Sequence, residues 1–384
     1  MTSLRRTTIT ASALRNNFFA VTVGDFTHSN CKKTTQMKKT HCILVAALLL
    51  LAACAPKEGE FAEPRFRKVE HRDFTILGEE LMLSVVGGEA AWRDHLILLS
   101  DDRATRNNIH IYSKRTGAWE LSALPVGRAA GEITLATDIQ VMGDTLYVFD
   151  NNPPRLKKYL LPALLAREPM SEVFLGEIPM SDRSMHWAGV APDRMVMVST
   201  LSPVDGPDHA PRILWTGPDG PVATYDAYPY EDRKLIWTLY STAYPYFALS
   251  PDGSKLVLST TWGSTVELFR LSDGEIVREH CLYWVDPEFV QGKPAATSRV
   301  GTSRILATDS GFITAFYSRE KDFDSGRNAC DRIAFFDWEG RGLRCIQLSG
   351  YSATPLSYVE QEGTLLALLW DGDNTMYLGK MALK

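Results

Sequence analysis

The chain has few cysteines, and they do not have the spacings that hold a structural metal. Three of its six cysteines lie within the first 54 residues, and the others are Cys281, Cys330 and Cys345. An odd number of thiols is unable to pair completely. No Cys-x-x-Cys pair or close Cys/His spacing is present, so a zinc module is not expected either. We therefore expect no disulfide scaffold, and we interpret the last three cysteines as buried thiols.

The familiar catalytic motifs are also missing. The sequence contains no Gly-x-Ser-x-Gly elbow, no phosphate-binding glycine loop followed by lysine, and no His-Glu-x-x-His pair. The histidines after residue 54 are scattered, and no two have metal-ligand spacing: His71, His95, His110, His186, His209 and His280. Motif-defined hydrolases and nucleotide-binding enzymes are therefore disfavoured. Carboxylates that meet only in the folded protein stay open, because one sequence does not reveal spatial pairs.

Long hydrophobic runs are absent except for one, at residues 43–51. Lys38 and Lys39 precede it, and Ala52, Ala53 and Cys54 follow it. This is the pattern of a secretory signal, and the run is shorter than the ~20 residues that span a bilayer. The end of the signal resembles a lipobox, so we expect residues 37–53 to be removed and Cys54 to be acylated. Residues 1–36 lack a periodic apolar face, and we interpret them as a mis-annotated extension before a true start at Met37.

A basic surface is lacking in the expected mature chain. Without residues 1–53, 34 basic and 45 acidic residues remain, a net charge of −11. Nucleic-acid binding depends on basic patches, and anionic lipid heads also attract basic segments. We therefore expect no nucleic-acid partner, and a membrane attachment that depends on the acyl chains.

Helical patterns are almost absent, since Leu160–Glu168 is the single plausible helical turn. Short runs of β-branched, aliphatic and aromatic residues recur instead, separated by Gly, Asp and Pro turns. Residues 244–283 show the unit: strands at 246–249, 255–260, 266–271 and 275–283 with tight turns between most of them. A four-strand meander of this length matches one blade of a β-propeller.

The same unit occurs six times in the sequence. Its expected strands are 96–99, 109–112 and 119–121 after Trp92; 138–141, 146–149, 156–159 and 173–175; 187–190, 195–198, 213–215 and 222–225; the unit above; 304–306, 312–317, 333–336 and 343–348; and 357–360, 365–369 and 376–378. The last unit lacks a strand, which we expect from residues 73–84 paired with 375–382, so that the ring closes without a free edge. The prediction is an all-β, six-bladed propeller of antiparallel blades over 73–384, with 54–72 as a lipidated tether. An antiparallel sandwich is the alternative.

One stretch resembles a known family. Gly127-Arg128-Ala129-Ala130-Gly131-Glu132, followed by Ile139–Asp150, resembles the second blade of TolB-like six-bladed propeller lipoproteins of Gram-negative bacteria. That family writes Gly-x-Gly-Pro-x-Glu before this strand, and Ala129 and Ala130 replace Gly and Pro here. The resemblance covers about residues 80–384. It implies the propeller fold and attachment to a Gram-negative membrane, with the outer membrane expected and its face left open, but it implies no reaction.

One loop has some of the features of a cation site. Residues 321–328 place Asp322, Asp324 and Asn328 in a short acidic segment, and calcium prefers such alternating oxygen ligands. However, Gly326 occupies an expected acidic position and no closing glutamate follows. We expect no cofactor, and Ca²⁺ at these three residues is the weaker alternative to a solvated loop.

The candidate binding face comes from an asymmetry between loops. In an up-and-down blade the second loop and the blade-to-blade connection share one face, and here the second loops are the longer and more polar ones. Function usually lies on such loops over a rigid scaffold. The candidate ligand or partner residues are Arg103, Arg155, Trp262 and Arg327 in the loops, with Asp138, His186, Tyr246 and Arg304 at the inner-strand starts.

Two functions stay open at the sequence level. We favour a monomeric binding or scaffolding module for a protein, peptide or glycan, because catalytic motifs are missing; fold alone does not decide this. Exposed aromatic rings would stack on sugars, although packing between blades also uses such rings. The alternative is an enzyme with a central-tunnel site, either a metal-assisted hydrolase or a polysaccharide lyase, built from Asp138, His186, Tyr246 and Arg304.

Overall fold

A computed structural model of the chain describes the following residues: 65–83, 86–102, 106–180, 186–191, 194–198, 211–217, 219–227, 246–259, 266–272, 274–282, 289–290, 293–294, 302–316, 330–371, 373 and 375–384. Contacts divide the chain into two units, Met1–Ala55 and Pro56–Lys384, and every described residue belongs to the second. The expected signal and the lipid site Cys54 lie outside the described residues.

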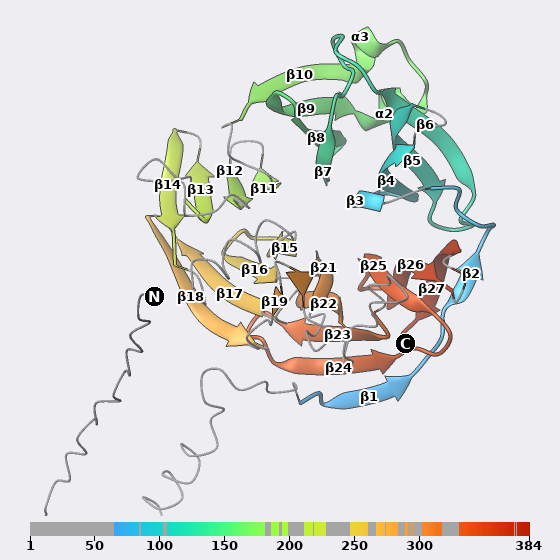
Figure 1. Ribbon diagram of the computed structural model, residues 1–384, viewed down its shortest axis with the longest axis vertical. Helices are drawn as coiled ribbons and strands as arrows, with labels where there is room; N and C mark the ends of the chain where they lie inside the picture. The colour runs from blue at the N-terminus through green and yellow to red at the C-terminus, as the bar shows by residue number, and fades with distance from the viewer. Residues whose placement is uncertain are drawn as a thin grey trace, which may run out of the picture. The chain divides into compact units, whose positions relative to one another are not determined.

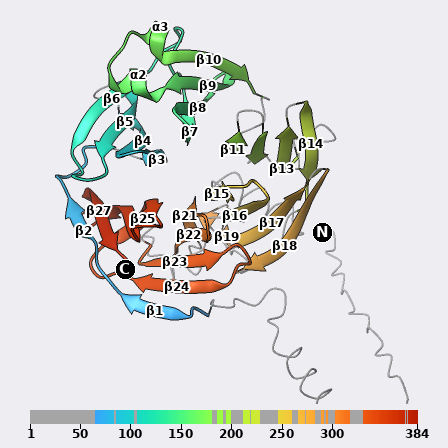
Figure 2. The same cartoon turned by 180° about the vertical axis from the view of Figure 1, so that it is seen from behind.

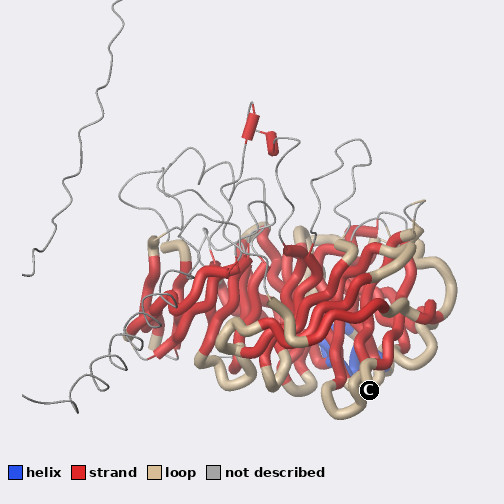
Figure 3. Tube along the Cα trace, turned by 90° about the horizontal axis from the view of Figure 1, so that it is seen from below, coloured by secondary structure: helices blue, strands red, loops and turns tan. Residues whose placement is uncertain are grey.

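The second unit is a six-bladed β-propeller, as the sequence predicts. Six antiparallel four-stranded blades surround a centre (Figure 1). The innermost strands contact one another in ring order: β3 contacts β7, followed by β11, β15, β21 and β25, and β25 returns to β3. Viewed edge on in Figure 3, the strands run from one face of this ring to the other.

The strands of blades 1 to 3 follow one another along the chain. Blade 1 comprises β3 (Val86–Trp92), β4 (His95–Asp102), β5 (Asn107–Ser113) and β6 (Trp119–Pro125). Blade 2 comprises β7 (Ala136–Met142), β8 (Thr145–Asn151), β9 (Pro154–Leu160) and β10 (Phe174–Pro179), with α2 (Leu161–Leu165) and α3 (Met170–Val173) before β10. Blade 3 comprises β11 (His186–Ala191), β12 (Arg194–Val198), β13 (Ile213–Gly217) and β14 (Gly220–Tyr225).

Blades 4 to 6 complete the ring. Blade 4 comprises β15 (Tyr246–Leu249), β16 (Lys255–Ser259), β17 (Val266–Ser272) and β18 (Glu275–Leu282). Blade 5 comprises β21 (Thr302–Ala307), β22 (Gly311–Phe316), β23 (Arg332–Asp337) and β24 (Gly342–Gln347). Blade 6 comprises β25 (Ser352–Val359), β26 (Thr364–Trp370), β27 (Met376–Ala382) and β2 (Thr75–Leu77); β19 (Phe289–Val290) and β20 (Lys293–Pro294) form a separate pair.

The burial of the middle strands explains why the fold could be predicted from the sequence. In β8 the residues 146–150 are all buried, and in β26 the residues 365–369 are all buried. A blade is covered by a neighbour on each side, so its middle strands lose the polar face that a one-sided sheet keeps. Continuous apolar runs result, and each pair of neighbouring blades shares one cluster of buried side chains.

The ring closes as predicted, with a strand from the N-terminal side. Strand β2 pairs antiparallel with β27, and Ile76 lies opposite Gly379. Blade 6 thereby combines a strand from residues 75–77 with strands from the end of the chain. Figures 1 and 2 show this N-terminal segment along the outer side of the ring.

The expected tether boundary needs a correction, because the folded part begins before residue 73. Strand β1 (Lys68–His71) pairs in parallel with β24 and adds a fifth strand to blade 5. Glu70 on β1 forms ion pairs with Lys68 and Arg72 at 3.0 Å and with Arg344 of β24 at 3.2 Å. Ion pairs of polar side chains hold this strand in place. Its sequence therefore lacks the pattern of apolar residues by which the other strands were predicted.

One cysteine differs from expectation. Cys330 and Cys345 are buried as expected, but Cys281 on the outer strand β18 is exposed. The helices among the described residues are short, and none of them is long and apolar enough to cross a membrane.

Candidate functional site

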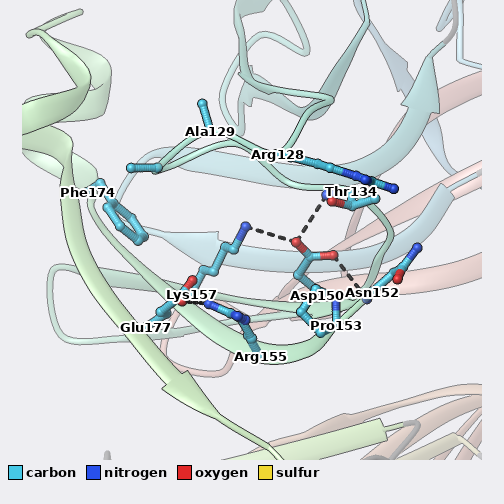
Figure 4. Close-up of a pocket in the computed structure, with 11 residues that line it drawn as sticks. Arg128, Ala129, Thr134, Asp150, Asn152, Pro153, Arg155, Lys157, Phe174 and Glu177 are labelled. Carbon is cyan, nitrogen blue, oxygen red and sulfur yellow. Dashed lines mark hydrogen bonds and ion pairs between the residues drawn. The ribbon is translucent and has the colours of Figure 1, made fainter.

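A pocket of about 540 Å³ opens in blade 2, between the connection from blade 1 and the β8–β9 hairpin. Its volume falls in the range that small-ligand sites occupy. Figure 4 shows its parts: the connection that carries Arg128 and Thr134 lies over Asp150, Lys157 and Asn152. The full lining is Arg128, Ala129, Ala130, Thr134, Asp150, Asn152, Pro153, Arg155, Lys157, Phe174 and Glu177.

The floor of the pocket is a buried ion pair. The Asp150 side chain is 1% exposed and the Lys157 side chain 8%, and the Lys157 amine lies 2.9 Å from Asp150 Oδ2. The Asp150 carboxylate also accepts the backbone N–H groups of Thr134 and Leu135, at 3.1 and 2.9 Å. A buried carboxylate needs several such partners. Asp150 therefore anchors the connection to the hairpin, and it has little capacity left for catalysis.

The roof is held by a second set of hydrogen bonds within residues 127–134. The Glu132 carboxylate accepts the N–H of Ala129 at 2.8 Å, and the Thr134 hydroxyl donates to the carbonyl of Gly127 at 3.1 Å. The Tyr159 hydroxyl donates to the carbonyl of Gly131 at 3.1 Å. Burial raises the pKa of Tyr159, and the nearby negative charge of Asp150 raises it further, so this hydroxyl stays a donor.

The mouth of the pocket carries the groups that a ligand would meet. Arg128 and Asn152 are exposed, while Arg155 forms an ion pair with Glu177 of β10. The Phe174 ring also lines the pocket and packs against Tyr159 with ring centroids 5.6 Å apart. Within the described part of the chain, Arg128 makes no ion pair. The mouth thus combines the guanidinium of Arg128, the amide of Asn152 and the aromatic ring of Phe174.

This pocket occupies the face where the sequence analysis placed the binding site. It is formed by a second loop, residues 151–154, and by a blade-to-blade connection, residues 126–135. Of the predicted residues, Arg155 lines it. Arg103, Trp262 and Arg327 lie outside the described residues, as do the candidate calcium ligands Asp322, Asp324 and Asn328.

The other predicted residues lie on the inner strands and are not brought to this pocket. Asp138 is partly buried in β7, and Tyr246 in β15 packs against the core between blades 4 and 5. His186 begins β11, and its side chain is not described. Arg304 in β21 forms an ion pair with Glu89 of β3 and donates to the carbonyl of Val86 at 2.8 Å.

The geometry near the centre does not favour the metal-assisted alternative. The Arg304 cation occupies a position expected for a metal ligand, and its charge is neutralised by Glu89. No group of three His, Cys, Asp or Glu side chains within the described ranges has a geometry suited to a metal ion. Arg304 therefore joins blade 5 to blade 1.

Sequence reasoning missed most of the pocket. Lys157 and Glu177 carried no motif, and Asp150 was noted only as the end of the stretch that resembles the TolB-like blade, because the pairing of these side chains depends on strand register. The residues 127–132 did carry a signal, since the family resemblance rests on them; they form the roof.

The comparisons with known proteins support the fold alone. No family model matches the chain, and no curated protein matches it in sequence. Among solved structures, a candidate exported protein of Bacteroides fragilis is 12% identical with a TM-score of 0.50, over 83% of this chain and 99% of that one. The calcium-binding protein regucalcin of Agrobacterium tumefaciens is 10% identical with a TM-score of 0.44, over 82% and 95% of the two chains. The first of these likenesses supports the propeller fold and nothing beyond it.

Proposed function

We propose that this protein is an exported binding module, anchored through an acylated Cys54, whose blade 2 pocket captures part of a protein, peptide or glycan partner. The observation that carries the proposal is the pocket itself. It has a ligand-sized volume and a preformed floor and roof, and its mouth exposes Arg128 and Asn152.

A binding role fits the chemistry better than a catalytic one. The buried pair Asp150–Lys157 is satisfied by the protein, so neither group is poised to transfer a proton. A rigid scaffold with polar groups at the rim of a pocket is typical of recognition sites. Membership of the TolB-like lipoproteins and an outer-membrane location belong to the same proposal, supported by residues 127–132 and by the signal before Cys54. The likeness to a candidate exported protein is in keeping with it.

Two variants test the proposal. Cys54→Ala should move the protein from the membrane fraction to the soluble fraction, and unchanged membrane attachment would contradict the anchor. Ala130→Trp should fill the pocket, since Ala130 is an exposed lining residue. We expect this variant to lose binding to a panel of oligosaccharides and peptides that the wild type recognises. Unaltered recognition across the panel would contradict the proposed site.

A further inference from the structure

The pocket distinguishes between classes of partner through its backbone. A bound peptide is usually held by free main-chain N–H and C=O groups, at a strand edge or in a turn. Several N–H groups around the pocket are already used: Gly127 donates to Ile133, Ala129 to Glu132, and Thr134 and Leu135 to Asp150. In the hairpin, Asn151 donates to Leu135 and Asn152 to Asp150, at 2.8 and 3.4 Å, and Pro153 has no N–H. These N–H groups are not available to a ligand, which favours recognition by the side chains of the lining.

The side chains that remain are a set that suits a sugar ring. Asn152 offers an amide that both donates and accepts, and Glu177, which pairs with Arg155, still has lone pairs that accept from hydroxyl groups. The Phe174 ring gives an apolar wall on which the C–H face of a pyranose would lie. The pocket volume of about 540 Å³ lies in the range of small-molecule sites.

The charge of the mouth indicates what the sugar carries. Lys157 is neutralised by Asp150 and Arg155 by Glu177, whereas Arg128 forms no ion pair within the part of the chain that the structure describes. A guanidinium binds a carboxylate through two parallel hydrogen bonds. The surface of the expected mature chain carries a net charge of −11, which repels a long polyanion. A glycan with a single acidic sugar at its end would pair with Arg128 and would avoid the repulsion that a long polyanion meets.

We infer that the blade 2 pocket binds a carboxylate-bearing sugar, with Arg128 on the carboxylate, Asn152 and Glu177 on ring hydroxyls, and Phe174 against the ring. This inference rests on the proposed function, because it names the partner of the same pocket. The glycan is recognised by its terminal acidic residue.

The test uses two sugars that differ at one group. Methyl β-D-glucuronide carries a carboxylate where methyl β-D-glucoside carries a hydroxymethyl group, and binding of both to the mature protein is measured by isothermal titration calorimetry. We expect the glucuronide to bind at least about tenfold more tightly, since a charge-assisted bidentate pair is stronger than a neutral hydrogen bond. Arg128→Ala should remove this preference, and Arg128→Lys should keep part of it. The matched control is Arg115→Ala, an exposed arginine in the β5–β6 turn outside the pocket, which should leave both affinities unchanged.

A third probe separates failure of this inference from failure of the proposed function. It is an acetylated tripeptide, Gly-Gly-Ala, with a free C-terminal carboxylate. Binding of the peptide but of neither sugar, lost in Arg128→Ala, would overturn the sugar assignment and keep the pocket as a binding site. Equal binding of both sugars, or a glucuronide affinity unchanged in Arg128→Ala, would overturn the role of Arg128. Absence of binding by all three probes would overturn the inference, and the panel with Ala130→Trp would then decide the proposed function separately.

Discussion

Arg304 of blade 5 forms an ion pair with Glu89 of blade 1, although blade 6 lies between these two blades in the ring. Both side chains are 14% exposed. The guanidinium also donates to the carbonyl of Val86, so it holds two groups of blade 1 near the centre. The bridge links strands that no sheet hydrogen bond connects, and it stabilises the closed ring from the inside.

Removing Arg304 should therefore destabilise the whole propeller. Arg304→Met leaves Glu89 as a largely buried charge without its partner, a change that costs about 3 kcal/mol in comparable buried pairs. Urea unfolding measures this loss. Arg93→Met is the control, because Arg93 and its partner Asp144 are 63% and 49% exposed and such surface pairs contribute less than about 1 kcal/mol. Equal effects of the two substitutions would contradict a structural role for the central bridge.

A second buried network joins blades 3 and 4. Glu267 of β17 is fully buried and pairs with Arg212, which is also buried, and with Arg278 at 2.8 Å. Glu267→Gln removes the carboxylate that pairs with both guanidinium groups, and we expect a loss of about 3–5 kcal/mol in the free energy of unfolding. Glu279→Gln, which affects the more exposed Arg270–Glu279 pair, should cost less than about 1 kcal/mol. A loss below 1 kcal/mol in Glu267→Gln would show that the network is dispensable.

The N-terminal segment passes close to blade 1 at a glycine. Gly117 has a φ of +73°, and a Cβ there would lie 2.5 Å from the carbonyl oxygen of Leu77. Gly143 has a similar φ of +61° and no atom within 4 Å of an added Cβ. Gly143→Ala should cost about 1 kcal/mol for the left-handed backbone alone, whereas Gly117→Ala adds the clash and should cost about 1–3 kcal/mol more. Thermal unfolding of the two variants compares them, and equal melting temperatures would mean that the close approach at Leu77 is absent.

Strand β1 should detach in acid. Burial opposes ionisation of Glu70, but the hydrogen bonds from Lys68 and Arg72 and the charge of Arg344 outweigh it and lower the pKa of Glu70 below its ordinary value of 4.5. A lowered pKa in the folded state means that the stabilisation is present above about pH 4.5 and is lost as the pH falls through the lower folded pKa. The protection of the amides of residues 68–71 against hydrogen exchange, relative to the intrinsic rate at each pH, should therefore fall below pH 4.5. In Glu70→Gln this protection should already be low at pH 7 and show no acid step; a step of unchanged size would point to another group.

The part of the fold that was predictable depends on apolar burial. Residues 146–149 and 365–369 read as strands because blades cover them on both sides, and the missing strand of blade 6 follows from the count of such runs. Strand β1 was not predictable, since Val69 is 57% exposed and Glu70 makes the contacts. A strand that depends on ion pairs leaves no hydrophobic pattern.

The sequence indicated the face of the ring on which the candidate site lies and one residue of its lining, but not the blade that carries it. Long polar second loops indicated the face, and Arg155 lies in the pocket on that face. The sequence did not reveal which side chains pair with each other, because the pairs form between neighbouring strands. Lys157 pairs with Asp150 across the β8–β9 hairpin, and Glu177 of β10 pairs with Arg155 of the adjacent strand β9. Arg212 and Glu267 are 55 residues apart and meet only once the ring has formed.

The most direct test of the pocket as the binding site is a crystallographic soak of the mature protein with a set of small sugars, sugar acids and short peptides. We predict electron density for a bound molecule between Arg128, Asn152 and Phe174 in blade 2, with the acidic group of the molecule against Arg128. Bound molecules on the opposite face, around the tight turns at 114–117 and 143–144, with the blade 2 pocket empty in every soak, would contradict the proposed site.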